Sequence, residues 1–161
     1  MYHRIVPDGT PLDSGSCDLP LGLFRRQVQL LKRWGFTSIT FADCRRWLDE
    51  GKKLPKRPVI MTFDDGYADT YDLAFPVLKE FGMRAVVFVL GDRTMTRNDW
   101  DIPLGLPLSP LINDSQILEM HTAGFEIGSH SMTHAHLVRL TREEVWEHAW
   151  SFTSPKLHSS P

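Results

Sequence analysis

Residues 59–66 read VIMTFDDG, and this stretch decides which fold the rest of the chain can adopt. Its first five residues are a continuous apolar run of strand length, too apolar for a half-exposed strand. We therefore expect a strand that is covered on both faces, as in a parallel sheet. Asp64 and Asp65 follow at the C-terminal tip of this strand, the end where chemistry gathers in parallel α/β sheets and barrels.

The rest of the chain alternates between short β-rich runs and longer helical patterns, which is typical of an α/β fold with helical crossovers. The predicted strands are 2–6, 37–40, 59–63, 85–90 and 125–129. The predicted helices are 24–34, 40–51, 70–81, 114–124 and 141–150, the third with a kink at Pro76 and the fourth capped by Asp114 or Ser115. Between them, residues 91–113 form a long irregular stretch, which we interpret as a wall or lid of a substrate site.

Length and charge narrow the fold and function classes. A parallel α/β barrel usually takes about 250 residues, so in a chain of 161 residues we expect a barrel that is incomplete at its C-terminal end. With 18 basic and 20 acidic residues and no long run of either sign, the chain lacks the charge pattern of a nucleic-acid binder. Cys17 and Cys44 have no metal or redox spacing, and no apolar stretch has the length of a signal peptide or membrane helix.

A second motif, HSMTH at residues 130–134, also follows directly on a predicted strand. A helical turn after that strand would bring His130 and His134 to the same side, because they are four residues apart. A catalytic zinc commonly takes three protein ligands from His and Asp/Glu, and Asp65 with these histidines supplies that set. Adjacent carboxylates on a strand end point in different directions, which leaves Asp64 as a candidate general base.

Each motif alone has a purely structural explanation. Two histidines four residues apart are often solvent-facing residues of a helix, and Asp-Asp-Gly is often a turn. We favour the metal site because both motifs follow buried strands, where an unpaired carboxylate pair would be costly without a cation.

The other histidines and the tryptophans receive structural interpretations, with one exception. His136 is close enough in sequence to support a ligand, and the remaining histidines are structural by default; these are His3, His121, His148 and His158. Four tryptophans at helical spacing are predicted to be core residues, namely Trp34, Trp47, Trp146 and Trp150. Trp100 lies in a polar loop, and we predict that it stacks on a sugar ring.

With these residues in view, the chain resembles the polysaccharide deacetylases of the NodB-homology type, also called carbohydrate esterase family 4. TFDDGY at 62–67 resembles the first motif of the family, and HSMTH at 130–134 resembles the second. Further matching stretches, from Met1 to about Trp150, are MYHRI at 1–5, AFPVL at 74–78, AVVFV at 85–89 and GFEIG at 124–128.

The resemblance implies a deacetylase-like domain over residues 1–150, folded as the N-terminal part of a distorted (β/α) barrel, and an irregular tail over 151–161. It implies a divalent metal, usually zinc, and hydrolysis of N-acetyl groups on a glycan, often one of N-acetylglucosamine. In the family motifs the first Asp is the general base and the second a metal ligand, places occupied here by Asp64 and Asp65. The histidines at 130 and 134 complete the ligand set, and Tyr67 and Trp100 are the expected substrate contacts.

The departures from the family pattern lead to an alternative function. Three motifs of the family belong further downstream than this chain reaches. They are the third motif with its Arg, the fourth with Asp and Trp, and the last, a Leu-x-His that supplies the general acid. Leu157–His158 arrives too early to take the role of that last motif. The chain would then be a truncated enzyme or, alternatively, a catalytically inactive metal-binding or glycan-binding module. A third interpretation is a related amidase or deformylase with a small or lipid-linked substrate.

The missing part would also contain the strands that close the barrel. An open sheet has an unpaired edge that attracts other strands. We therefore expect the chain to self-associate, to pair with another chain, or to be part of a longer one. The family is mostly extracytoplasmic, yet this stretch shows no export signal, so the sequence leaves its location open.

Overall fold

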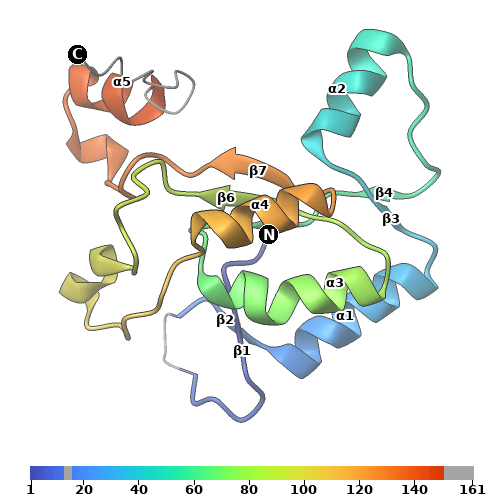
Figure 1. Ribbon diagram of the computed structural model, residues 1–161, viewed down its shortest axis with the longest axis horizontal. Coiled ribbons are helices and arrows are strands. Elements are labelled where there is room, and N and C mark those ends of the chain that lie inside the picture. Colours follow the sequence, from blue (N-terminus) through green and yellow to red (C-terminus); the bar gives the residue numbers. More distant parts are fainter. Residues whose placement is uncertain (13–15, 151–161) are drawn as a thin grey trace.

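The computed structural model describes residues 1–12 and 16–150 of the chain (Figure 1). The predicted irregular tail at 151–161, with His158, lies outside the described residues, and so does the side chain of Trp150. The division into a domain over 1–150 and a tail therefore stays a prediction.

Every strand pairing is parallel within the described part of the chain, which confirms the predicted α/β class. The strands are β1 (Arg4–Val6), β2 (Asp18–Pro20), β3 (Thr37–Ser38), β4 (Pro58–Val59), β5 (Thr62–Phe63), β6 (Val86–Val89) and β7 (Glu126–Ser129). The central sheet has the order β5-β6-β7, while β1 pairs with β2 and β3 with β4. The apolar run at 59–63 is thus divided between β4 and β5, and β2 is a short strand that the sequence pattern did not predict.

Tyr2 joins the first strand pair to the central sheet. It forms a parallel bridge with Phe63, its N–H donates to the Thr62 carbonyl at 2.8 Å, and its own carbonyl accepts from the Asp64 N–H at 2.9 Å. This bridge extends the central sheet to an open parallel layer in the order β2-β1-β5-β6-β7, with β3-β4 as a separate pair, and the described strands close no barrel. The barrel prediction is confirmed only as a partial α/β arrangement.

The helices connect these strands in the predicted order. They are α1 (Leu21–Arg33), α2 (Phe41–Glu50), η1 (Thr70–Ala74), α3 (Phe75–Glu80), η2 (Asp99–Leu104), α4 (Asp114–Thr122), η3 (Leu137–Arg139) and α5 (Arg142–Trp150). In Figure 1, α1 and α3 lie side by side and α4 lies against β7, whereas α2 and α5 stand apart from this group. No helix in the described ranges has the length and apolar character needed to cross a membrane.

The core lies between the central sheet and the helices α1, α3 and α4. Its members are buried apolar side chains that include Phe24, Val28, Phe63, Leu78, Val87, Val89, Met120 and Phe125. Burying a side chain of this size contributes about 1.5–3 kcal/mol, so this layer holds the strand ends in place. Phe63 and Ile127 point into the core. Because side chains alternate along a strand, Asp64, one residue after Phe63, and His130, three residues after Ile127, point to the opposite face of the sheet.

The helix predicted at 70–81 contains Pro76 and consists of two contiguous segments, η1 and α3, while the kink at Pro76 stays a prediction. Its first part, η1, is a turn of π-helix, in which the Phe75 N–H donates to the Thr70 carbonyl. A proline lacks the N–H for a helical hydrogen bond, and its ring clashes with the carbonyl four residues earlier. The wider π-helical turn just before Pro76 accommodates this ring, so the helix continues.

The predicted helix ends are confirmed at α2 and shifted at α4. Thr40 Oγ1 accepts a hydrogen bond from the Asp43 N–H, and Gly51 ends the helix in a left-handed conformation at φ 67°. At α4 the cap is Asn113, one or two residues before the predicted Asp114 or Ser115. Its Oδ1 accepts from the Gln116 N–H at 3.0 Å. The shift arises because only Asn113 is paired three residues ahead with a Gln that bonds back.

The prediction that the tryptophans at helical spacing belong to the core is wrong wherever it can be checked. Trp34, Trp47 and Trp146 are 57%, 48% and 63% exposed. Periodicity identifies a helical face, but whether another element covers that face depends on tertiary packing. Helix α2 shows this directly, because none of its residues is buried.

Candidate metal centre

Asp65 lies in a strained turn at the tip of β5. Asp65 and Gly66 both adopt left-handed backbone conformations, each at φ 71°. For a residue with a side chain this conformation costs about 1–2 kcal/mol, and such strain is often stored at functional sites. Gly66 cannot be replaced freely, because a Cβ there would lie 3.1 Å from Val89 Cγ1. The close approach of this turn to β6 thus sets the position of Asp65.

His130 and His134 are brought together by a tight turn after β7. The sheet ladder continues to His130, whose N–H donates to the Val89 carbonyl at 2.8 Å. Ser131 and His134 then adopt left-handed conformations at φ 62° and 60°, and Ser131 Oγ accepts from the His134 N–H at 3.1 Å. The predicted helical turn is therefore wrong in its geometry, since a left-handed conformation breaks a helix. Both histidines nevertheless return to the same side.

The three predicted ligand atoms converge on one point. His130 Nε2 and His134 Nε2 lie 3.0 Å and 3.1 Å from Asp65 Oδ1. Although these separations are as short as hydrogen bonds, Asp65 Oδ1 is buried and has no well-directed hydrogen-bond partner. A buried carboxylate oxygen without a partner is costly, and a cation shared by the three atoms would remove that cost. The donor set of one carboxylate and two imidazoles fits a divalent metal with a position left for water.

The charges at this site also suit a cation. Burial alone would raise the pKa of the Asp65 carboxyl, but the imidazoles of His130 and His134 outweigh it and hold that pKa well below its usual value. The pKa of His130 is raised, mainly by its contact with Asp65, against the effect of burial. Asp65 therefore presents a full negative charge to any bound ion.

Asp64 lies beside this group without belonging to it. Its carboxylate is close enough to add to the rise in the pKa of His130, and its side chain is partly exposed. The ligand atoms that share one point come from Asp65, His130 and His134 alone among the described residues. Of the two adjacent carboxylates, Asp65 therefore belongs to the convergent group and Asp64 does not.

A pocket of about 240 Å³ opens next to Asp65 and His134. Its walls include both predicted substrate contacts, Tyr67 and Trp100. The Tyr67 hydroxyl donates to Asp101 Oδ2 at 3.0 Å, and the Arg4 guanidinium lies 5.3 Å from the centre of the Tyr67 ring. Burial, followed by the nearby Asp101, raises the pKa of Tyr67, so that its hydroxyl stays protonated.

His3 also lines this pocket, although its sequence context favoured a structural role. Tyr2 pairs with Phe63, and the two segments run parallel. The residues that follow them, His3 and Asp64, therefore lie beside each other. The only sequence signal for this placement was the match of the MYHRI stretch to the family. The position of His3 in the pocket is decided by the register between two strands that are distant in sequence.

The segment 91–113 forms the wall that the sequence predicted. Asn98 is 1% exposed and holds the segment together, donating to Asp101 Oδ2 at 2.6 Å and accepting from the Ser109 N–H at 2.5 Å. The Ile112 N–H donates to the Gly66 carbonyl at 2.8 Å, which ties the wall to the turn that carries Asp65. The wall is therefore an ordered part of the site.

Comparison with known proteins gives consistent results. Residues 51–151 match the family model described as "Polysaccharide deacetylase". YxkH of Bacillus subtilis strain 168, which carries the name of a polysaccharide deacetylase, is 30% identical over 144 residues, covering 89% of this chain and 45% of YxkH. The poly-beta-1,6-N-acetyl-D-glucosamine N-deacetylase of Escherichia coli K12 is 35% identical over 104 residues, covering 65% of this chain and 15% of that protein.

Solved structures share the fold. The Streptococcus pyogenes deacetylase PplD superimposes with a TM-score of 0.70 at 24% identity, covering 89% of this chain and 59% of PplD. IcaB from Ammonifex degensii superimposes with a TM-score of 0.64 at 27% identity, covering 81% of this chain and 50% of IcaB. These deacetylases have a (β/α) barrel, of which the described residues form a part. The chain thus spans 45% of the length of YxkH, 50% of IcaB and 59% of PplD.

Proposed function

The chain belongs to the polysaccharide deacetylase family, and from this premise we propose that it removes N-acetyl groups from a glycan of the N-acetylglucosamine type with a bound divalent metal, most simply zinc. The observation that carries the proposal is the convergence of Asp65, His130 and His134, with a buried Asp65 oxygen that lacks a hydrogen-bond partner. The names of the relatives, which include poly-N-acetylglucosamine deacetylases, support the substrate class.

In this proposal the protein groups divide the work of amide hydrolysis. Asp65, His130 and His134 hold the metal, which when bound would polarise the amide carbonyl and lower the pKa of water to about 7. Asp64 takes the proton of the attacking water as general base. The C–N bond then breaks, and His3 donates a proton to the leaving nitrogen, so that the products are acetate and a free amine. Tyr67 and Trp100 contact the sugar ring.

His3 also bears on the alternative function. The hypothesis of an inactive binding module rested on the absence of the family's general-acid and arginine motifs, and His3 bears on the first of these. An imidazole can donate a proton near neutral pH, and His3 places one in the same pocket as the metal ligands. We therefore favour the enzyme, and release of acetate distinguishes the two functions.

The test combines metal content with acetate release from N-acetylglucosamine oligomers. Wild type should bind stoichiometric zinc and free acetate. Asp64→Asn should keep the metal and lose about 10²–10⁴-fold in rate, because the base is removed while the ligands remain. His130→Ala should lose both the bound metal and acetate release. The matched control is His121→Ala, because His121 is exposed on α4, and this variant should keep the metal and the activity.

Two outcomes would contradict the proposal in different ways. If wild type binds no stoichiometric metal, the hypothesis of a metal site is contradicted. Wild type that binds zinc and the oligomers but frees no acetate would favour the binding module.

A further inference from the structure

The ring of His134 is covered on one face by the indole of Trp100. The ring centres are 4.6 Å apart and the planes differ by 17°, which is a close stacking contact. At the same time His134 Nε2 is 3.1 Å from Asp65 Oδ1. The imidazole is thus held on its face by Trp100 while its edge is directed at the metal site.

His134 lacks the support that metal-binding histidines usually have. Such a histidine normally donates its second ring N–H to a carboxylate or carbonyl, which sets the orientation of the ring. Among the described residues, no group hydrogen-bonds to the second ring nitrogen of His134. Its backbone is held only locally, by the hydrogen bond to Ser131 Oγ at 3.1 Å. Apart from the contacts with the other two members of the group, Asp65 and His130, stacking on Trp100 is the contact among the described residues that restricts rotation of the His134 ring.

Trp100 is itself held by buried groups. Its ring centre is 6.2 Å from that of Tyr67, which is only 4% exposed. Tyr67 donates to Asp101 Oδ2 at 3.0 Å, and this carboxylate also accepts from Asn98 at 2.6 Å. Asn98 is the buried centre of the wall segment. The support therefore runs from Asn98 through Asp101 and Tyr67 to Trp100.

We propose that Trp100 is a positioning residue for the metal, which acts by stacking on His134 and keeping its Nε2 directed at the ion. This inference rests on the metal site of the proposed function and adds a role for Trp100 beside its predicted contact with the sugar. Losing the group that orients a metal ligand typically weakens metal binding by about 10–100-fold.

The experiment measures the zinc affinity of the full chain by competition with a chelating dye. Trp100→Leu removes the aromatic face and should weaken zinc binding at least about tenfold. Trp100→Phe keeps a flat ring at the same place and should restore most of the affinity. Trp47→Leu is the matched control, because Trp47 is 48% exposed on α2 and should not affect zinc binding.

Unchanged zinc affinity in Trp100→Leu would overturn the inference while leaving the proposed function intact. If wild type binds no stoichiometric zinc, the proposed function fails and this inference fails with it. If Trp100→Leu does not fold, Co²⁺ titrations of wild type and Trp100→Phe decide the matter through tryptophan emission. Bound Co²⁺ should quench the tryptophan emission of wild type, and this loss of emission should nearly disappear in Trp100→Phe. An equal loss of emission in both proteins would overturn the inference.

Discussion

At the scale of the residue, the site depends on backbone conformations that few side chains tolerate. Asp65, Gly66 and His134 are all left-handed, and Gly66 also packs against Val89. These turns place the ligand atoms where straight strand ends could not. Hydrogen bonds to neighbouring segments compensate for this strain. The Gly66 carbonyl accepts from the Ile112 N–H of the wall segment, and the His130 N–H donates to the Val89 carbonyl of the sheet.

We predict that Gly66→Ala destabilises the protein by about 1–3 kcal/mol, because it adds a close contact to an unfavourable backbone conformation. The control is Gly105→Ala, which has a similar φ of 69° but no atom within 4 Å of the added Cβ. Urea unfolding should show the smaller loss, about 1 kcal/mol, for the control. Equal losses in both variants would mean that the contact with Val89 carries no cost.

We also predict that His3→Ala lowers the rate of acetate release by about 10²–10⁴-fold with unchanged zinc content, since His3 lines the pocket but is not a ligand. Rates and metal content are measured on the same preparations, with His121→Ala as the control. Activity close to wild type in His3→Ala would assign the proton donor to another group.

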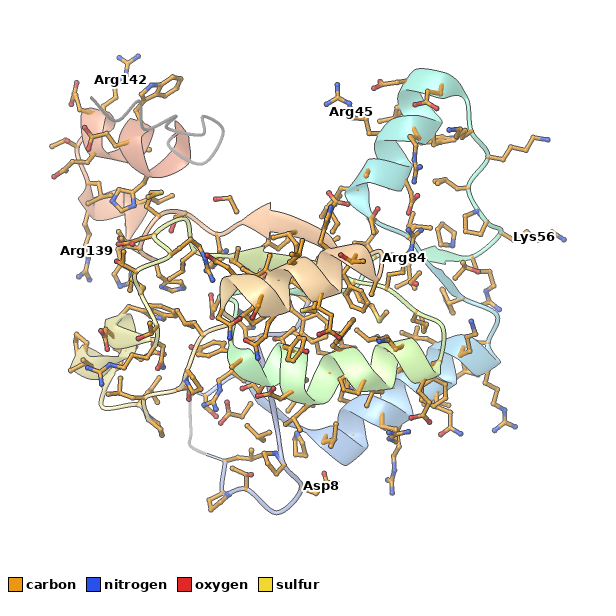
Figure 2. All side chains as sticks on the ribbon, viewed as in Figure 1. Asp8, Arg45, Lys56, Arg84, Arg139 and Arg142 are labelled. Carbon is orange, nitrogen blue, oxygen red and sulfur yellow. The ribbon has the colours of Figure 1, made fainter. Side chains whose placement is uncertain are left out.

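At the scale of the element, α2 is held to the body of the protein through its first turn. None of its residues is buried, but the Ala42 N–H donates to Glu126 at 2.9 Å and Asp43 pairs with Arg84 at 2.7 Å. Arg84 is labelled in Figure 2 at the base of this helix, while Arg45 and Lys56 extend into solvent around it. Polar contacts, together with a ring contact between Phe41 and Phe88 at 6.3 Å, thus anchor α2 at its first turn.

This anchoring predicts a pH-dependent effect of Asp43→Asn. Burial alone would raise the pKa of Asp43, but hydrogen bonds from Thr40 and Arg46 and the charge of Arg84 lower it below its usual value. The ionised carboxylate therefore stabilises the fold above a pH of about 4, and this contribution is lost as the pH falls through the lowered pKa. Asp43→Asn should cost about 1 kcal/mol at neutral pH and progressively less in acid.

Urea unfolding at several pH values checks this prediction. Asp49→Asn is the control, because its ion pair with Arg45 is highly exposed and contributes little. A loss in Asp43→Asn that stays constant down to the most acidic pH would rule out the charge as its cause.

At the scale of the whole molecule, the described strands form an open parallel layer that ends on β7. Parallel sheets are normally covered on both faces and at their edges, and an uncovered edge invites pairing with another strand. Helices α1, α3 and α4 cover one side of this layer (Figure 1). The edge of β7 has no partner strand in the part of the chain that the structure describes.

We therefore predict that the chain self-associates, with an average mass that rises with concentration in light scattering after size exclusion. Ile127→Lys would disturb the core, and Glu126→Pro would remove the hydrogen bond that the Glu126 N–H donates to the Ala85 carbonyl. The informative change is therefore Ser129→Pro, because the N–H groups of a strand alternate in direction and that of Ser129 faces the free edge of β7. Its matched control is Glu119→Pro on α4, which tests whether any proline lowers the mass by unfolding. A single monomeric mass for wild type at all concentrations would contradict the prediction.

The sequence by itself determined the α/β class, the order of the main helices and strands apart from β2, and the group of candidate metal-ligating residues. These features follow from local patterns: an apolar run marks a buried parallel strand, and the polar residues after it lie at the functional end of the sheet. VIMTFDDG and HSMTH carry both kinds of information, so the proximity of Asp65, His130 and His134 could be predicted from these two stretches alone.

Only the tertiary structure decided how other residues join this site or stay away from it. His3 reaches the pocket through the register of Tyr2 with Phe63, and Trp100 lies on His134 because Asn98 folds its segment back. Trp34, Trp47 and Trp146 stay largely exposed although they fall at helical spacing. The physical reason is the same in each case: pairing and coverage between distant segments depend on packing, which local periodicity does not encode.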